Sequence, residues 1–250
     1  MAPTPFHLDR KTILVTGASS GIGRQIAISA AQMGATLVLT GRNEQELNKT
    51  LSELTGENHT IIPADLLLQG DREKLANEIP LVDGIVNCAG IVTPFPAKFL
   101  DQEKLDQTLN INYEAPVLMM AAILKKKKIN RDASLVFLSS ISGQHPHKGG
   151  AAYAGSKAAI ESFVKVLALE LYPQGIRANY ISPAMVKTPM YDKAAEQMST
   201  EEMDKHVSKY PLGAGLPEDV ANAAIYLLSP ASRWVTGINL ILDGGYLLGA

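Results

Sequence analysis

Residues 12–23 read TILVTGASSGIG, a short apolar, β-branched run followed at once by a turn that contains Gly17, Gly21 and Gly23. A buried strand that ends in such a turn and leads into a helix lets the backbone approach a pyrophosphate. The helix then offers free N–H groups and the positive end of its dipole. The spacing is GxxxGxG, which differs from the GxGxxG fingerprint of dinucleotide-binding proteins. Taken alone, the segment also fits a purely structural tight turn.

Outward from this stretch, short apolar runs alternate with helical patterns along the chain. The predicted strands are Thr12–Thr16, Ala35–Thr40, His59–Ala64, Leu81–Asn87, Ala133–Leu138, Ile176–Ile181 and Gly237–Leu242. The longest predicted helices cover about Asp101–Lys128 and Ala151–Tyr172. Apolar strands without polar alternation are typical of parallel strands covered on both faces. The sequence therefore predicts an α/β fold, a doubly wound seven-stranded parallel sheet with helices on both faces, in a single domain of residues 1–250.

Composition and charge narrow the class of protein. The 250 residues are 46% hydrophobic and 19% charged, with a formal net charge of −2, values typical of soluble globular proteins. We therefore expect neither a nucleic-acid partner nor a membrane partner. The single cysteine, Cys88, excludes an internal disulfide. Because the N-terminal residues also lack the apolar core of a secretory signal, we expect a cytoplasmic location.

The end of the second predicted strand bears on the choice of cofactor. Dinucleotide-binding folds often place an acidic residue here, which binds the ribose hydroxyls of NAD. This chain instead reads Thr40-Gly41-Arg42-Asn43. A guanidinium pairs with a 2′-phosphate that a carboxylate would repel, so we expect NADP (NADPH) rather than NAD. An ordinary solvated arginine at a helix start is the alternative. Asp65, after the third strand, fits either a hydrogen bond from adenine or a helix N-cap.

Tyr153 and Lys157 form a second candidate site. They lie four residues apart in a predicted helix, so both side chains share one helix face. A free tyrosine titrates near pH 10, and a nearby ammonium favours the phenolate and lowers its pKa. Lowering that pKa to about 7 requires about 4 kcal/mol. Such a pair is common by chance among surface residues, so its meaning depends on the rest of the chain.

Five motifs, in order and at suitable spacing, supply that context. They are TGASSGIG at 16–23, NCAG at 87–90, the serine pair 139–140, YAGSK at 153–157 and DGG at 243–245. With them the chain resembles, over essentially its whole length, the short-chain dehydrogenase/reductase family, especially its 3-oxoacyl-acyl-carrier-protein-reductase-like and tropinone-reductase-like members. The resemblance implies a Rossmann-type fold. It also implies an oxidoreductase that transfers the pro-S hydride between nicotinamide and a carbonyl or secondary alcohol, with a 3-oxoacyl thioester as one substrate class.

The resemblance also assigns roles to individual residues. Tyr153 would exchange a proton with the substrate oxygen, Ser140 would hold that oxygen, and Lys157 would lower the tyrosine pKa and bind the nicotinamide ribose. Asn112 would support a water chain from the lysine to solvent. The cofactor would be held by Gly17, Ser19, Ser20, Gly21, Ile22, Gly23, Arg42, Asp65, Leu66, Asn87, Ala89, Gly90, Tyr153, Lys157, Pro183, Val186 and Thr188.

A different class of protein keeps the fold without the chemistry: a non-catalytic NAD(P)-binding sensor or scaffold. The complete set of four catalytic positions argues against it, because a protein without turnover has no need of all four. We expect no metal, since His145 and His147 lack further ligands nearby in sequence. A homo-oligomer, dimer or tetramer, would be assembled through the helices near 101–128 and 151–172.

Two positions depart from the family pattern. Cys88 stands where asparagine is usual, and we interpret it as a tolerated small buried residue, with a redox-sensing thiol as the alternative. Ala184 follows Pro183 where glycine is common. Alanine resists positive φ, so the geometry of this loop is open.

The substrate side is less determined. Segments 91–98, 141–150 and 184–216 would surround the substrate, and the last carries Met185, Met190, Met198 and Met203. A long methionine-bearing insertion predicts a lid, although methionines packing a small helical excursion are the alternative. The three segments present no obvious charged clamp. We therefore expect a small-molecule substrate in an apolar pocket, where an acyl thioester, a steroid-like ketone, a sugar and a small diketone remain open.

Two further features are set aside. The run Lys125–Lys128 ends a long predicted helix, where cations complement the helix dipole, so we interpret it as a solvated helix end rather than a nucleic-acid patch. Trp234 is interpreted as a core or interface residue.

Overall fold

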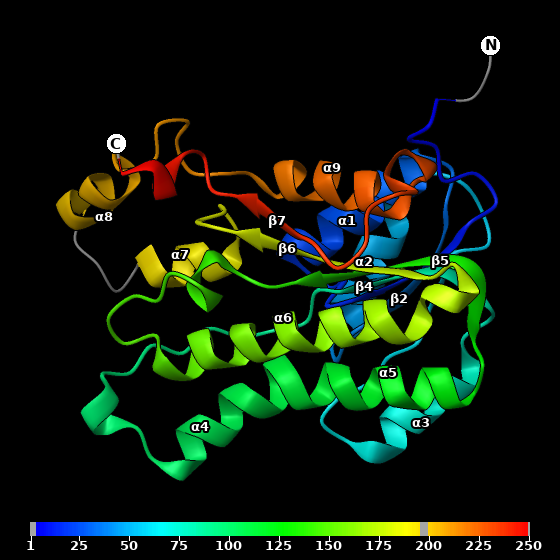
Figure 1. Ribbon diagram of the computed structural model, residues 1–250, viewed down its shortest axis with the longest axis horizontal. Coiled ribbons are helices and arrows are strands. Elements are labelled where there is room, and N and C mark those ends of the chain that lie inside the picture. The colour runs from blue at the N-terminus through cyan, green and yellow to red at the C-terminus, as the bar shows by residue number, and fades with distance from the viewer. Residues whose placement is uncertain (1–3, 196–199, 250) are drawn as a thin grey trace.

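The fold is built on one parallel sheet. The computed structural model describes residues 4–195 and 200–249. The strands are β1 (Thr12–Thr16), β2 (Thr36–Thr40), β3 (Thr60–Ile61), β4 (Val82–Asn87), β5 (Ile129–Leu138), β6 (Arg177–Pro183) and β7 (Asn239–Leu242). They pair in the order β3-β2-β1-β4-β5-β6-β7, and every neighbouring pair is parallel (Figure 1). The predicted doubly wound α/β sheet is therefore confirmed.

Helices cover both faces of this sheet (Figure 1). One layer contains α1 (Gly21–Gln32), α2 (Glu44–Ser52) and α9 (Pro217–Leu228), and the other contains α3 (Gln69–Glu78), α4 (Gln102–Leu109), α5 (Ala115–Lys125) and α6 (Ala151–Leu171). Successive side chains of a strand point to opposite faces. In β1, Ile13 and Val15 join the first core and Leu14 joins the second. The strands are continuously apolar because both of their faces are buried.

The strand order reverses at β1, whose neighbours are β2 and β4. In open α/β sheets, ligands bind outside the carboxyl ends of the strands at such a switch point. Two short helices, α7 (Pro189–Ala195) and α8 (Thr200–Val207), lie beyond the carboxyl end of β6 and outside the two helix layers (Figure 1). The architecture therefore places the loops after β1, β4, β5 and β6 along one edge.

The structure corrects several predicted boundaries. The helix expected over Asp101–Lys128 is divided into α4, a π-helical turn at Asn110–Glu114, and α5. Pro116 has no N–H, so no hydrogen bond runs from it to the carbonyl of Asn112. The N–H of Ala115 donates to the carbonyl of Asn110, five residues back, as in a π-helix. The third strand pairs over two residues only, as is common at a sheet edge. Helices α3 and α9 were not singled out from the sequence.

Three surface features complete the description. Trp234 is 93% exposed, so the core interpretation is wrong, and the interface interpretation stays a prediction. Lys125, Lys126 and Lys127 are exposed at the end of α5, while the Lys128 ammonium donates to the carbonyl of Ile79 at 2.7 Å. Among the described residues, no helix combines the length and the apolar character needed to cross a membrane.

Candidate active site

The glycine-rich turn between β1 and α1 lies against the segment that follows β4. Gly17 has φ +66°, and a Cβ at this position would lie 2.9 Å from the backbone N of Ala89. A Cβ on Gly23 would collide with the carbonyl of Gly17. The Thr16 hydroxyl accepts hydrogen bonds from the N–H groups of Cys88 and Ala89, at 3.1 and 3.2 Å. Glycine is therefore required where two backbone segments meet at the switch point.

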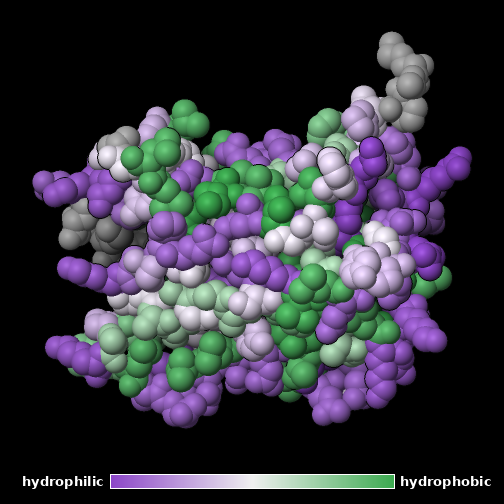
Figure 2. Space-filling model, in the orientation of Figure 1, coloured by the Kyte–Doolittle hydropathy of each residue, from purple (hydrophilic) through white to green (hydrophobic). Residues whose placement is uncertain are grey.

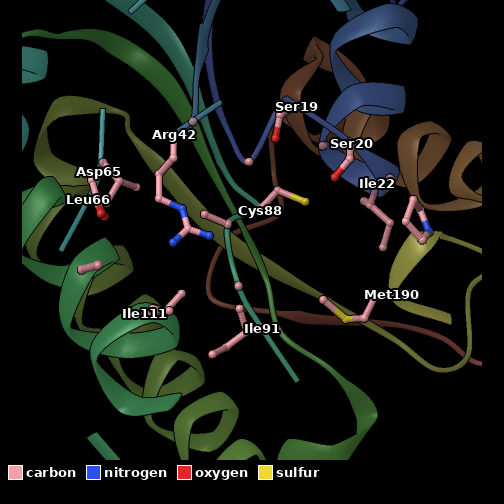
Figure 3. Close-up of a pocket in the computed structure, with 18 of the residues that line it drawn as sticks. Ser19, Ser20, Ile22, Arg42, Asp65, Leu66, Cys88, Ile91, Ile111 and Met190 are labelled. Carbon is pink, nitrogen blue, oxygen red and sulfur yellow. The ribbon is translucent and has the colours of Figure 1, made fainter. Parts of the chain in front are cut away.

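A pocket opens beside this turn, at the carboxyl edge of the sheet (Figure 3). Arg42, Asp65 and Leu66 lie at one end, and Ile22 and Met190 lie at the other (Figure 3). The predicted cofactor residues in its wall are Gly17, Ser19, Ser20, Gly21, Ile22, Gly23, Arg42, Asp65, Leu66, Ala89, Gly90 and Thr188. The predicted residues that are not in its wall are Asn87, Tyr153, Lys157, Pro183 and Val186.

Further lining residues were missed by sequence reasoning. They are Gly41, Ala64, Leu67, Ile111, Ala115 and Pro189. Most of them are direct neighbours in sequence of a predicted site residue, and Ala115 lies one helical turn beyond Asn112. That adjacency is the signal that could have found them.

The two charged side chains at one end of the pocket differ in how they are held. No carboxylate of residues 4–195 and 200–249 pairs with Arg42, which is exposed and directed into the pocket (Figure 3). Asp65 accepts a hydrogen bond from the Leu67 N–H at 3.0 Å. The N-cap of α3 is Leu68, so the helix N-cap alternative for Asp65 is wrong. Asp65 instead closes the turn before that helix.

Arg24 shows by contrast what a structural arginine looks like in this turn. Its guanidinium donates to the Ser19 carbonyl at 2.6 Å and pairs with Glu46 at 2.9 Å. These bonds fasten the glycine-rich turn to α2. Arg24 is therefore occupied by the protein, and Arg42 is the arginine available to a ligand in this pocket.

Helix α6 carries Tyr153 and Lys157 on one face, four residues apart, as predicted. The Lys157 ammonium lies 5.6 Å from the centroid of the Tyr153 ring and donates to the Leu138 carbonyl at 2.7 Å. Burial lowers the pKa of Lys157 to about 8, and the charge of Glu161 opposes this effect. Lys157 is thus mostly an ammonium at neutral pH, and its charge is sensitive to its neighbours.

Burial is the main influence on the pKa of Tyr153. Burial raises its pKa, and the contact with the Ser140 hydroxyl only partly opposes this rise. The sequence argument assigned a lowering toward 7 to Lys157 together with the positive charge of oxidised nicotinamide, and in this structure burial is the largest effect on the pKa of Tyr153. Tyr153 is therefore protonated at neutral pH, the form that donates a proton.

Ser140 follows β5 and begins the short 3₁₀ helix Ile141–Gly143. It is 8% exposed, and its hydroxyl oxygen accepts a hydrogen bond from the Ser142 N–H at 3.2 Å. That bond leaves the hydroxyl proton available to a group facing it. The structure brings Ser140 into contact with Tyr153 although the two lie in different elements.

Asn112 sits in the π-helical turn and is buried. Its side chain accepts from the Ile91 N–H at 2.8 Å, and its amide donates to the Ile91 carbonyl at 2.9 Å and to the Ser156 hydroxyl at 3.1 Å. A Cβ on Gly90 would lie 3.1 Å from the Asn112 Oδ1 and 3.6 Å from the Lys157 ammonium. Asn112 therefore joins the segment after β4 to helix α6, next to Lys157.

Asn87 and Cys88 occupy the end of β4. The Asn87 amide faces the sulfur of Met120 at 3.9 Å, on the side of α5. Cys88 lines the pocket, and burial raises the pKa of its thiol to about 12. A thiol with this pKa stays protonated at neutral pH, which favours the tolerated small residue over the redox sensor.

The segment after β6 approaches the glycine-rich turn. Ala184 does not belong to the described residues with positive φ, so alanine fits this loop without strain. Val186 forms a bridge with Gly215, and the Thr188 methyl would lie 3.5 Å from a Cβ on Gly21. The Thr188 hydroxyl accepts from the Tyr191 N–H at 3.3 Å, at the start of α7.

The remaining sequence-based predictions concern the substrate side. Met190 is 46% exposed and lines the pocket, Met203 is buried, and Met198 lies outside the described residues. His145 and His147 are exposed, and within residues 4–195 and 200–249 no three histidine, cysteine or carboxylate side chains gather as a metal-ligand set.

Comparisons with known proteins agree with this geometry. Residues 17–247 match the family model described as Enoyl-(Acyl carrier protein) reductase. The chain is 34% identical over 244 residues to a 3-oxoacyl-acyl-carrier-protein reductase of Rickettsia felis, covering 97% of this chain and 99% of the relative. It is 33% identical to an NAD-dependent glycerol dehydrogenase of Listeria innocua, covering 97% and 96% of the two chains.

Solved structures give the same result. A short-chain dehydrogenase/reductase family protein superposes with a TM-score of 0.87 at 30% identity, covering 96% of this chain and 99% of that one. A glucose/ribitol dehydrogenase of Brucella melitensis superposes with a TM-score of 0.89 at 29% identity, covering 96% and 98% of the two chains.

Proposed function

This chain belongs to the short-chain dehydrogenase/reductase family, and from that premise we propose that it is an NADPH-preferring carbonyl reductase. Members of this family are oxidoreductases that bind a nicotinamide cofactor and act on carbonyl or CH–OH groups. The observation that carries the proposal is the position of Tyr153, Ser140 and Lys157, which meet beside a glycine-walled pocket. A buried acid next to a cofactor-shaped cleft is the arrangement that carbonyl reduction requires.

The pocket fits a dinucleotide by its own backbone. Gly17 and Gly21 both have positive φ, and a side chain at Gly17 would crowd the Ala89 backbone. The turn leads directly into α1, whose first N–H groups suit a pyrophosphate. In the proposal these residues hold NADPH, together with the other predicted wall residues. The bound cofactor would supply the hydride.

The protein's own groups handle the proton. Tyr153 would donate its phenolic proton to the carbonyl oxygen as that oxygen gains charge, and Ser140 would donate a hydrogen bond to the same oxygen. The Lys157 ammonium, fixed by the Leu138 carbonyl, would stabilise the phenolate that forms. Asn112 would hold the end of β4 against α6 through its three hydrogen bonds.

The NADPH preference rests on Arg42. It is a cation without a carboxylate partner among the described residues, directed into the pocket from the end of β2 (Figure 3). A 2′-phosphate would pair with this guanidinium, whereas NADH offers it only hydroxyl groups. Relatives differ in cofactor, since one named above is NAD-dependent. The choice is therefore argued from this chain's own residues.

For the substrate we propose a 3-oxoacyl thioester, the class named for the Rickettsia relative. An acyl chain needs an apolar wall. Met190 supplies one at the end of the pocket away from Arg42, and Ile91 and Ile111 add apolar surface elsewhere in its wall (Figure 3). The segment 184–216, which contains α7 and α8, would act as the lid over this end.

We further propose that residues 1–250 work as one domain within a homo-oligomer. Both cores pack on the same sheet, which supports a single folding unit. On the outer side of α6, Val166 is 46% exposed and Leu169 is 73% exposed. Figure 2 shows apolar surface along α6 and part of α5. A second copy would cover this surface in a dimer or tetramer.

The proposal is tested by titrating the protein with NADPH and with NADH while nicotinamide fluorescence is followed. Arg42→Ala should weaken NADPH binding by about 10- to 100-fold, the value of a charge-assisted contact, and leave NADH binding unchanged. Arg233→Ala, an exposed arginine far along the chain, is the matched control. Equal losses for both cofactors would contradict the role of Arg42, and no binding of either would contradict the function itself.

A further inference from the structure

Glu161 is a buried carboxylate that the proposed chemistry does not use. It lies on α6, one helical turn beyond Lys157 and two beyond Tyr153, and it is 5% exposed. Burying a carboxylate is unfavourable unless its oxygens accept hydrogen bonds or face a positive charge. A buried glutamate at this position of the helix therefore needs an explanation.

Both carboxylate oxygens of Glu161 are engaged by the turn that carries Ser140. The Ser139 hydroxyl donates to one oxygen at 2.8 Å, and the Gln144 amide donates to the other at 3.0 Å. Each oxygen accepts a hydrogen bond, which is the pattern of an ionised carboxylate. The two donors lie on either side of the 3₁₀ helix Ile141–Gly143, so Glu161 binds the turn at both of its ends.

The turn also approaches Glu161 through its backbone. A Cβ on Gly143 would lie 2.5 Å from the Glu161 Oε1 and 3.2 Å from the backbone N of Ala158. Only glycine lets the turn come this close to α6. The distance between the element that carries Ser140 and the element that carries Tyr153 and Lys157 is thus set here.

The charge of Glu161 acts on the titratable groups around it. On α6 it raises the pKa of Lys157, which burial otherwise lowers to about 8. On β6 it raises the pKa of Tyr180, a buried phenol whose pKa burial also raises. Lys157 additionally faces Cys88, whose thiol has a pKa raised by burial to about 12 and is therefore uncharged near pH 8.

We propose that Glu161 is a positioning residue of the reductase: its buried carboxylate fixes the Ser139–Gln144 turn to helix α6 and places a negative charge one helical turn from Lys157. The inference rests on the proposed function, because it gives Ser140 and Lys157 their reason to be held. Glu161 does not touch the reacting atoms. It acts through Ser139, Gln144 and Lys157.

The Glu161→Gln variant removes the negative charge and keeps the hydrogen bonds to the Ser139–Gln144 turn. The glutamine carbonyl can still accept from Ser139, and its amide can donate to a flipped Gln144 amide, so the turn stays in place. Without the negative charge, the pKa of Lys157 should fall below its value of about 8 by about one unit. The alkaline limb of the kcat/KM profile for carbonyl reduction should move to lower pH by the same amount.

Gly143→Ala makes the opposite separation, since it keeps the charge and displaces the turn. It should lower kcat by about tenfold with little movement of the pH limb, because Ser140 is misplaced. Glu161→Ala should combine both effects, and Glu170→Gln is the matched control on the same helix, at an exposed position. The affinity for NADPH should stay within about twofold throughout, because none of these residues lines the pocket.

A readout independent of turnover is the pH titration of the Lys157 Cε resonance in lysine-labelled protein, assigned with Lys157→Arg. A Lys157 midpoint and a pH limb that coincide in Glu161→Gln and wild type would overturn the charge role. Unchanged kcat in Glu161→Ala, or in Ser139→Ala combined with Gln144→Ala should the former not fold, would overturn the fastening role. A wild-type protein that reduces no carbonyl while the Lys157 midpoint still shifts would refute the proposed function and leave the electrostatic coupling intact.

Discussion

The two halves of the carboxyl edge are built in different ways. The cofactor half consists of the glycine-rich turn and the ends of β2, β3 and β4, and the substrate half consists of residues 141–150 and 184–216. In the cofactor half, Gly17 has φ +66° and meets the Ala89 backbone, whereas in the substrate half Gly213 has φ +76° and no heavy atom within 4 Å of an added Cβ. Close backbone approach thus dictates sequence in the cofactor half and at Gly143 in the substrate half, whereas it leaves the sequence around Gly213 open. This is why the cofactor class follows from the residues and the substrate does not.

The largest effect is expected at the boundary between the halves. Tyr153→Phe removes the proton donor and should lower kcat for carbonyl reduction by about 10³-fold. NADPH affinity should change by less than about twofold, because phenylalanine keeps the ring and removes one hydroxyl among the many predicted cofactor contacts. Steady-state kinetics with fluorescence titration measures both quantities.

Tyr172→Phe, an exposed tyrosine just beyond the same helix, is the control and should behave as wild type. If NADPH binding disappeared together with turnover in Tyr153→Phe, the two halves would not be separable in the way described.

A second, smaller effect compares the two glycines directly. Both have positive φ, which costs an alanine about 1–2 kcal/mol. Gly17→Ala must also displace the Ala89 backbone, so its free energy of unfolding should fall by about 3 kcal/mol, against about 1 kcal/mol for Gly213→Ala. Urea denaturation of the two variants measures the difference. Equal losses in the free energy of unfolding would mean that the backbone of the cofactor half adjusts to an added Cβ as easily as that of the substrate half.

The smallest effect concerns the base of the proposed lid. Tyr210 and Tyr246 stack with their ring centroids 4.7 Å apart, which joins the end of α8 to the C-terminal segment. Such a stack contributes about 0.5–1.5 kcal/mol. Tyr246→Leu should therefore raise the KM for the carbonyl substrate a few-fold and leave the NADPH affinity unchanged.

Tyr226→Leu offers the matching control in the other half of the molecule. Tyr226 lies on α9 and packs against Phe6, with ring centroids 6.4 Å apart. The Tyr226→Leu variant should lose about as much free energy of unfolding as Tyr246→Leu, without any change in the KM for the carbonyl substrate. A KM change in both variants would show that general loosening, rather than the lid, is responsible.

Sequence reasoning reached the fold because its signals are local and repeated. Apolar strands such as Thr12–Thr16 are buried on both faces, and the glycine spacing at 17–23 reflects a contact that only glycine permits. The candidate site followed from the family resemblance carried by five ordered motifs, one of which places Tyr153 and Lys157 four residues apart on one helix face. The remaining features depend on distant neighbours. The burial that raises the pKa of Tyr153, and the exposure of Trp234, result from packing that no local pattern encodes.

The π-helical turn at Asn110–Glu114 was also invisible, because apolar spacing does not reveal which carbonyl a given N–H will reach. Pro116 was the available hint, since it removes the donor to the Asn112 carbonyl. Because of that turn, Ile111 and Ala115 line the pocket, whereas the side chain of Asn112 lies outside the lining and bonds to the Ile91 backbone.

Because of the π-helical turn, residues 110–114 are more sensitive to the insertion or deletion of a residue than to a change of side chain. Each residue advances an α-helix by about 100° and 1.5 Å. Loss of the single codon for Ile111 would let the backbone close into an uninterrupted α-helix, and the Asn112 amide would swing away from the Ile91 backbone that it now holds on both sides. We therefore expect substitutions at the outer positions of residues 110–114 to be tolerated, while a one-residue deletion or insertion there abolishes the enzyme.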